Sequence, residues 1–378
     1  MKCIILVGGF GTRLRPLTFT LPKPLIQFCN KSIVEHQIEA AVNAGVKHVI
    51  LAVGWKADDM QEALAEFRER YGIEITCSVE ESPLGTAGPI RLAEKILRNN
   101  APDDEPFFVF NSDVICEFPL KEMLAYHKAH GREGTICVTR VDDPSKFGVV
   151  VSDDTGKIAR FVEKPKEFIS DRINAGLYVL NMPVIDRVDA NVFRMIETDV
   201  FPKMAAEEQL YSYNLNGYWA DIGQPRDFLR GMKLHLASLE RRQKDNIDLT
   251  PRSRMSPLSV DAKFSLKGNT VLIDPSAVIE EGCVIGPNVT VGKHVHVGKG
   301  VRISNASIFD GTKIGDYSHI NESIIGWRNK VGRWTKIDNN TVTGENVSIA
   351  DELFINGAVI LPHKGIKEKI IQEGTILM

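Results

Sequence analysis

In the first part of the chain, segments with the hydrophobic pattern of strands are followed by segments with the hydrophobic pattern of helices. The apolar runs over 3–7 and 48–53 are typical of strands buried on both faces of a sheet, and a third strand is expected over 74–79. Apolar residues spaced three or four apart follow over 33–45 and 57–70, where helices are expected to end at Gly45 and Gly72. Strand, helix, strand and helix at this spacing predict a doubly wound parallel sheet of the α/β class.

The pattern changes after residue 134 to shorter strands in which apolar and polar residues alternate. Turn signals such as Asp153-Asp154-Thr155-Gly156 separate them, which favours antiparallel hairpins beside the parallel sheet. The first domain is therefore expected to have a mixed sheet. A helix is expected over 89–97, strands over 106–110, 135–141, 148–152, 157–163 and 175–180, and a long closing helix over 225–242.

Beyond residue 260 a hydrophobic residue recurs every six positions, and this register slips by one at Ile308 and at Ile325. Period six is typical of a left-handed parallel β-helix, in which three short strands form each coil. A polar segment with two prolines precedes it. The sequence thus predicts an α/β domain over 1–242, a linker over 243–259 and a β-helix over 260–378. The recurring positions are Ile273, Ile279, Ile285, Val291, Val297, Ile303, Ile308, Ile314, Ile320, Ile325, Val331 and Ile337.

Composition agrees with two globular domains. A chain of 378 residues is too long for one ordinary core, and 46 Lys and Arg against 49 Asp and Glu give no basis for a nucleic-acid or membrane partner. The first residues lack a cleavable-signal layout, and no apolar stretch approaches the roughly 20 residues of a transmembrane helix. Six singly scattered cysteines indicate reduced core thiols, so a cytoplasmic location is expected.

A glycine-rich segment with fixed cations follows directly on the first strand. Glycine lets the chain turn sharply and brings bare backbone N–H groups close to an anion. Leu14 stands where a dinucleotide fingerprint needs its third glycine, and no G-K-S/T of a P-loop is present. A lone G-x-G would suggest only a surface turn, but the longer pattern favours a cradle for a polyphosphate. Its members are Gly8, Gly9, Gly11, Arg13, Arg15 and Lys23.

Asp113 follows the apolar strand expected over 106–110. The carboxyl end of a central strand borders the crevice where open α/β sheets bind ligands. Magnesium takes oxygen ligands and usually only one or two from protein, so Asp113 fits a metal ligand. The alternative for an aspartate at a strand end is a capping role.

The sequence resembles the sugar-nucleotide pyrophosphorylases, a family of nucleotidyltransferases, over nearly its whole length. Within that family it is most similar to the eukaryotic GDP-mannose pyrophosphorylases of the catalytic, beta type. The glycine segment with the motif over 22–25 begins the resemblance. It continues through 28–31, 84–88, 111–116, 144–148, 161–165, 173–176, 219–223 and 326–332.

The resemblance implies that GTP and mannose 1-phosphate condense to GDP-mannose and pyrophosphate by direct attack on the α-phosphorus. It implies Mg²⁺ on Asp113 and Asp221 as the cofactor, with Arg13 and Lys23 on the leaving β- and γ-phosphates and Lys164 on the sugar phosphate. The nucleophile is already an anion, so catalysis needs alignment and charge neutralisation and not an activated dyad. The substrate-binding set that it implies is Leu6, Gly8, Gly9, Gly11, Gly85, Asn111, Asp113, Gly148, Glu163, Lys164, Asn174 and Asp221.

The chemistry of these residues fits, although single motifs have simpler explanations. A glutamate such as Glu163 accepts from two sugar hydroxyls, and an asparagine such as Asn174 both donates and accepts. Glu163 and Lys164 alone would equally suit a solvated ion pair at a sheet edge. The loop at Gly85, which the resemblance assigns to the nucleobase, would also suit an ordinary strand-to-helix turn.

Three alternatives are weighed against this function. An acyltransferase would use a histidine of the repeat, His294, His296 or His319, but no long loop interrupts the coils there. A non-catalytic regulatory subunit would have lost the metal carboxylates or the phosphate cations. Another nucleoside triphosphate and sugar phosphate would share the same motifs. The β-helix predicts a homo-oligomer, with a related regulatory subunit as a further partner.

Overall fold

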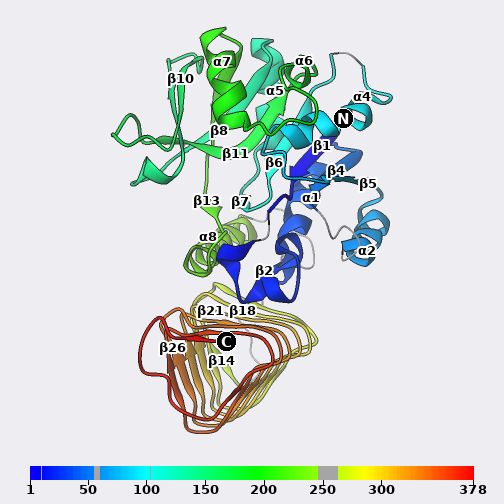
Figure 1. Cartoon of the computed structure of the whole chain (residues 1–378). Coiled ribbons are helices and arrows are strands. Elements are labelled where there is room, and N and C mark those ends of the chain that lie inside the picture. Colours follow the sequence, from blue (N-terminus) through cyan, green and yellow to red (C-terminus); the bar gives the residue numbers. More distant parts are fainter. Residues whose placement is uncertain (10, 55–59, 103, 246–262) are drawn as a thin grey trace. The chain divides into compact units, whose positions relative to one another are not determined.

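The computed structural model describes residues 1–9, 11–54, 60–102, 104–245 and 263–378. The chain forms two compact units (Figure 1). Unit 1 comprises Met1–Gly9 with Val34–Trp219, and unit 2 comprises Phe10–Ile33 with Ala220–Met378. From residue 246 on, the predicted linker lies outside the described residues. The domain boundaries drawn from the sequence stay predictions.

The parallel part of the sheet in unit 1 is built from the apolar runs. β1 (Lys2–Leu6) lies between β4 (His48–Val53) and β6 (Phe107–Asn111), and β5 (Glu74–Val79) forms the edge beyond β4. All pair in parallel, so that Ile5 lies level with Leu51 and Phe110. Every residue of β1 is buried because both faces of the sheet are covered. The parallel sheet of the sequence analysis is confirmed.

Antiparallel strands extend this sheet on the other side of β6. β11 (Arg172–Leu180) runs antiparallel to β6, and β9 (Gly148–Ser152) and β10 (Ile158–Glu163) form a hairpin next to it. The mixed sheet is thereby confirmed. β8 (Gly134–Arg140) pairs with β11, and β12 (Leu210–Asn214), which the sequence pattern did not predict, pairs in parallel with β8.

The helices of unit 1 are α1 (Ile33–Asn43), α2 (Gln61–Tyr71), α3 (Gly88–Leu92), α4 (Glu94–Arg98), α5 (Leu120–His130), α6 (Pro183–Asp186), the π-helix η6 (Ile196–Val200) and α7 (Phe201–Ala206). Three helical segments of unit 1 were predicted, and α1 and α2 confirm the first two, although the predicted start of the second at residue 57 lies outside the described residues. The helices α5, α6, η6 and α7 were not predicted. The expected helix over 89–97 is split at Ala93, whose ψ of 2° leaves the helical range. Ala93 and its neighbours Ile90 and Leu97 are all buried in the unit 1 core, so the break keeps both short helices on that core.

Unit 2 contains the predicted β-helix, in which every third strand joins the same parallel sheet (Figure 1). Ile285 lies opposite Ile303, eighteen residues on, whereas Ile303 lies opposite Ile320, only seventeen on. The shorter coil is the reason for the slip in the six-residue period. Inward-facing isoleucines and valines form one continuous core.

The strands of the β-helix fall on three faces. One face has β14 (Ser265–Leu266), β17 (Val284–Ile285), β20 (Arg302–Ser304), β23 (His319–Asn321), β26 (Lys336–Asp338) and β29 (Phe354–Asn356). The second has β15 (Val271–Ile273), β18 (Val289–Val291), β21 (Ala306–Ile308), β24 (Ile324–Ile325), β27 (Val342–Thr343), β30 (Val359–Ile360) and β32 (Ile376–Leu377). The third has β16 (Val278–Ile279), β19 (His296–Val297), β22 (Lys313–Ile314), β25 (Lys330–Val331), β28 (Ser348–Ile349) and β31 (Gly365–Ile366).

The segment after the glycines belongs to unit 2 together with α8 (Pro225–Lys244). Phe28 is fully buried, and its ring packs edge-on against Phe228 of α8 with centroids 5.1 Å apart. The segment after the glycines consists of η1 (Thr12–Leu14), η2 (Leu17–Phe19), η3 (Lys23–Leu25), β2 (Gln27–Phe28) and β3 (Lys31–Ser32), and β13 (Trp219–Asp221) precedes α8.

None of the helices in the described part of the chain is both long and apolar enough to cross a bilayer.

Candidate functional site

Gly11 fixes the loop that carries the predicted phosphate cations. Its φ is +59°, and a Cβ there would lie 3.1 Å from Cβ of Lys23 and 3.0 Å from Cγ2 of Thr18. The Thr18 hydroxyl donates to the Gly11 carbonyl at 2.9 Å. A side chain at residue 11 would press against both neighbours, so glycine favours the close approach of this loop to Lys23.

Arg13 and Asp221 meet at a second glycine of unit 2. A Cβ on Gly223 would lie 2.9 Å from Oδ1 of Asp221 and 3.1 Å from Nη2 of Arg13. The Gly223 N–H donates to that same Oδ1 at 2.8 Å, which fixes the orientation of the carboxylate. Unit 2 thus brings together the predicted guanidinium and the predicted metal carboxylate at Gly223, and Lys23 lies beside Gly11 in the same unit.

Asn111 and Asn174 converge on one buried tyrosine of unit 1. Nδ2 of Asn174 donates to the Tyr178 hydroxyl at 2.8 Å, and Asn111 also hydrogen-bonds this hydroxyl. Gly176 has φ +76°, and a Cβ there would lie 3.0 Å from Nδ2 of Asn111. Burial raises the pKa of Tyr178 well above its ordinary value, so the hydroxyl stays protonated and can donate. Sequence reasoning missed Tyr178, because a tyrosine within an apolar strand carries no special signal.

Asp113 lies in the turn between β6 and β7 (Val114–Cys116), half-buried, at the carboxyl end of the parallel sheet as predicted. Asn111 is the last residue of β6, two positions earlier. The two side chains therefore belong to the edge where ligands of open α/β sheets bind.

Glu163 and Lys164 form an ion pair over a glycine. Nζ of Lys164 lies 3.1 Å from Oε1 of Glu163, and Gly148 is the cross-strand partner of Glu163. A Cβ on Gly148 would lie 2.8 Å from Oε2 of Glu163, so glycine makes room for the carboxylate. Lys164 is 65 % exposed, as both a substrate ligand and a solvated edge pair require.

The predicted nucleobase loop is held by backbone contacts. Gly85 has φ +78°, and a Cβ there would lie 2.3 Å from the carbonyl oxygen of Arg194. The N–H of Ala87 donates to that carbonyl, and the N–H of Arg194 donates to the Leu84 carbonyl, each at 3.0 Å. Close packing alone therefore demands glycine at residue 85. Its contact with a base stays a prediction.

Glu80 begins this loop and was not among the predicted site residues. Its side chain is 8 % exposed, and Oε2 accepts from the Leu84 N–H at 3.1 Å. Oε1 is buried, has no hydrogen-bond partner among the described residues, and lies 3.4 Å from where a Cβ of Gly8 would be. Burial raises the pKa of Glu80. In the sequence Glu80 is only an acid that directly follows the strand predicted over 74–79, and its burial is visible in the structure alone.

Family models match both parts of the chain. Residues 2–238 match the model described as nucleotidyl transferase, and residues 267–376 match the GMPPB C-terminal domain. The chain belongs to the nucleotidyl transferase family. Its β-helix is the part that matches the C-terminal domain model.

Relatives with the same name match along the whole chain. The chain is 51% identical to the mannose-1-phosphate guanyltransferase of Neurospora crassa over 98% of both chains. It is 51% identical to that of Schizosaccharomyces pombe and 49% identical to mannose-1-phosphate guanyltransferase beta-B of Xenopus laevis, each over 100% of both chains.

Solved structures resemble the nucleotidyl transferase fold. A putative glucose-1-phosphate thymidylyltransferase from Bacillus anthracis has a TM-score of 0.55 at 21% identity, covering 67% of this chain and 98% of its own. HddC from Yersinia pseudotuberculosis has a TM-score of 0.51 at 28% identity, covering 61% of this chain and 97% of its own. The first of these supports the fold alone.

Nucleotidyl transferases of this family generally use a divalent metal, and the residues present fit one. Within the described ranges no group of three or more His, Cys, Asp or Glu side chains could hold an ion. Magnesium needs only one or two protein carboxylates beside water and phosphate oxygens. Asp221, whose carboxylate is oriented by the Gly223 N–H, is a suitable metal ligand of this kind.

Proposed function

We propose that this chain is a mannose-1-phosphate guanylyltransferase that condenses GTP and mannose 1-phosphate to GDP-mannose and pyrophosphate. The observation that carries the proposal is the similarity of 49% to 51% identity to curated mannose-1-phosphate guanyltransferases over essentially the whole of both chains. The predicted cations and carboxylates are all present as well. A subunit that had lost catalysis would be free to lose them.

Unit 2 would hold the leaving group. Arg13 and Lys23 carry fixed positive charge on a loop shaped by Gly11, where they would bind the β- and γ-phosphates of GTP. As the bond to the α-phosphorus breaks, negative charge grows on the departing pyrophosphate. Cations already in position stabilise that charge without reorganisation.

Unit 1 would hold the sugar phosphate. Lys164 would neutralise its phosphate, and Glu163 would accept hydrogen bonds from the mannose hydroxyls. Asn174, held at the Tyr178 hydroxyl, would donate to or accept from the sugar. These groups align an oxygen of the sugar phosphate, already an anion, for attack on the α-phosphorus.

Asp113 and Asp221 would hold Mg²⁺ as the cofactor. When bound, Mg²⁺ supplies positive charge next to phosphate oxygens and so lowers the repulsion between the two anionic substrates. A cytoplasmic location, a homo-oligomer and a related regulatory subunit stay predictions.

Glu80 supplies a reason for guanine. Guanine presents two adjacent donors, N1–H and the N2 amino group, whereas adenine presents an amino group beside an acceptor. An ionised carboxylate only accepts hydrogen bonds. Oε1 of Glu80, buried beside Gly8 and without a partner among the described residues, is a matching acceptor. Guanine would give this oxygen the hydrogen bond that a buried polar atom requires.

Glu80→Gln is expected to lower kcat/KM for GTP by about ten- to a hundredfold, the value of a hydrogen bond to a charged group. The preference for GTP over ATP is expected to shrink with it. Because burial raises the pKa of Glu80, activity with GTP should also fall on the acid side at a higher pH than an ordinary glutamate would give. Steady-state rates with both nucleotides across pH measure both effects.

Glu81→Gln is the matched control, because it removes the same charge from the adjacent, exposed position. It is expected to leave the GTP to ATP ratio unchanged. An unaltered ratio in Glu80→Gln would show that Glu80 only braces the loop through Leu84.

The reverse reaction tests the function itself. Purified protein, GDP-mannose, labelled pyrophosphate and Mg²⁺ are expected to yield labelled GTP and mannose 1-phosphate. GDP-glucose in place of GDP-mannose is expected to react more slowly. Label that appears only with a different sugar nucleotide would move the substrate, and no label with any would contradict the proposal.

A further inference from the structure

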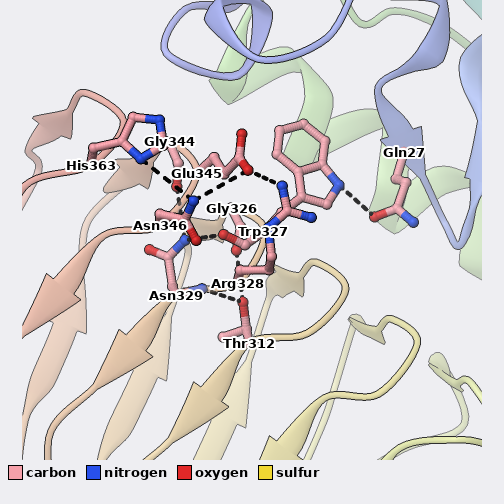
Figure 2. Close-up of polar contacts among 10 residues, drawn as sticks. All are labelled: Gln27, Thr312, Gly326, Trp327, Arg328, Asn329, Gly344, Glu345, Asn346 and His363. Atoms are coloured by element: carbon pink, nitrogen blue, oxygen red, sulfur yellow. Dashed lines mark hydrogen bonds and ion pairs between the residues drawn. The ribbon is translucent and has the colours of Figure 1, made fainter.

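The β-helix holds a side chain of the segment that carries Lys23. Gln27 lies four residues after Lys23, and its amide is bound at both ends. Its Nε2 donates to Oδ2 of Asp310 at 2.6 Å, and its Oε1 accepts from Nε1 of Trp327 at 3.2 Å. Figure 2 shows the indole nitrogen of Trp327 directed at the Gln27 amide. Both partners belong to the β-helix, and all these residues belong to unit 2.

Trp327 is itself fixed in place. Its side chain is only 5 % exposed, and its ring packs against Phe309 with centroids 4.8 Å apart. Below it the fully buried Asn329 donates from Nδ2 to the carbonyls of Trp327 and Gly344, at 2.9 and 2.8 Å (Figure 2). Contacts within the β-helix therefore fix the direction of the indole N–H independently of Gln27.

Asp310 is equally fixed. Its Oδ1 accepts from the Lys293 N–H at 2.6 Å, which leaves Oδ2 for Gln27. β2, which contains Gln27, pairs antiparallel with β3. A second contact holds this hairpin, because Nδ2 of Asn30 donates to the Val291 carbonyl at 2.9 Å.

Short backbone links join Gln27 to Lys23. Ile26, next to Gln27, donates its N–H to the Lys23 carbonyl at 3.1 Å, and Leu25 donates to the Pro22 carbonyl at 2.9 Å. Gly11 packs against Cβ of Lys23 on the other side. A shift of Gln27 would therefore shift the backbone that aims Lys23.

We propose that Trp327 and Asp310 are positioning residues for the guanylyl transfer: by holding both ends of the Gln27 amide they set the place of Lys23. This inference rests on the proposed function and on the role given there to Lys23. It makes the β-helix a part of the machinery that binds the leaving pyrophosphate, beyond any role in assembly.

Trp327→Phe keeps the ring that packs on Phe309 and removes only the N–H. It is expected to raise the KM for pyrophosphate in the reverse reaction, and to lower kcat/KM for GTP, by roughly fivefold, the typical effect of one hydrogen bond. The KM for mannose 1-phosphate is expected to stay unchanged. Trp334→Phe is the matched control, since Trp334 is 62 % exposed and stacks on Tyr317.

A charge exchange separates positioning from general destabilisation. Gln27→Glu places a carboxylate against Asp310 and is expected to cost about twentyfold or more in kcat/KM for GTP. Asp310→Asn in the Gln27→Glu background is expected to restore most of it, because the asparagine amide then donates to the new carboxylate. Oδ1 of that asparagine still accepts from Lys293, and Trp327 still donates to residue 27.

A double-mutant cycle with Lys23→Ala gives the decisive readout. If Trp327 acts through Lys23, Trp327→Phe is expected to have little further effect once Lys23 is gone. The full fivefold loss in both backgrounds, no rescue by Asp310→Asn, or unchanged kinetics in Trp327→Phe would each overturn the inference. Wild-type protein without guanylyltransferase activity would instead overturn the proposed function.

Discussion

Asp113→Ala is expected to lower kcat at least a hundredfold while the protein stays folded. Asp113 lies in the turn after β6, half-buried, at the carboxyl end of the parallel sheet. Removing a group that places positive charge next to the reacting phosphates lowers transition-state stabilisation by on the order of 3 kcal/mol, which corresponds to roughly a hundredfold in rate. Initial rates of pyrophosphate release at saturating GTP and mannose 1-phosphate measure the loss.

Two further variants make this result specific. Asp113→Asn keeps the shape of the side chain and is expected to raise the Mg²⁺ concentration needed for half-maximal activity. Asp154→Ala removes an exposed aspartate from the turn between β9 and β10 and is expected to leave turnover unchanged. Near-normal turnover in Asp113→Ala, with unaltered Mg²⁺ dependence, would mean that Asp113 only caps its strand.

Lys23→Ala is expected to lower kcat at least as much as Asp113→Ala, and to change the KM of a particular substrate as well. Because Lys23 is assigned to the β- and γ-phosphates, its loss should raise the KM for pyrophosphate in the reverse reaction and lower kcat in both directions by roughly a hundredfold. The KM for mannose 1-phosphate should change little. Steady-state kinetics in both directions separate these effects.

Lys164→Ala is the informative counterpart of Lys23→Ala, because Lys164 is assigned to the other substrate. It is expected to raise the KM for mannose 1-phosphate and to spare pyrophosphate. Lys128→Ala, on the exposed face of α5, is expected to be neutral. Identical kinetic changes in the Lys23 and Lys164 variants would contradict the separate roles.

Strong local periodicity made much of the fold predictable. β4 and β5 begin and end at the predicted residues. An apolar run such as that of β4 has few alternatives to a buried strand, and in β5 apolar and polar residues alternate as in a half-buried strand. The six-residue repeat likewise predicted the β-helix, and the seventeen-residue coils account for its slips. β12, with the sequence Leu-Tyr-Ser-Tyr-Asn, has a mixed pattern and depends on pairing with the distant β8.

The parts of the site that could not be predicted depend on long-range contacts. The glycine loop and Asp113 carry local signals, so they were identified from the sequence. Gln27 and Trp327 are 300 residues apart, and although Trp327 lies in a segment that carries the resemblance, nothing in the sequence links the two residues. Glu80 required knowledge of burial, since its significance lies in one oxygen without a partner among the described residues.

Gly85 teaches the reverse lesson about motifs. The resemblance assigned this glycine to the nucleobase, yet the Arg194 carbonyl leaves no room for any side chain there. A residue can thus be required by the geometry of a loop whatever the loop binds. Variants at Gly85 would therefore disturb the loop itself, and Glu80 is the better position at which to test base recognition.

The most direct test is the forward reaction across substrates. Pyrophosphate release by the purified protein is measured with Mg²⁺ and mannose 1-phosphate, using GTP, ATP, UTP and dTTP in turn, and then with glucose 1-phosphate. A clear preference for GTP with mannose 1-phosphate is the predicted result. Preference for another pair of nucleotide and sugar phosphate would contradict the substrate assignment. The absence of pyrophosphate release with every pair, in protein shown to be folded, would contradict catalysis by this chain.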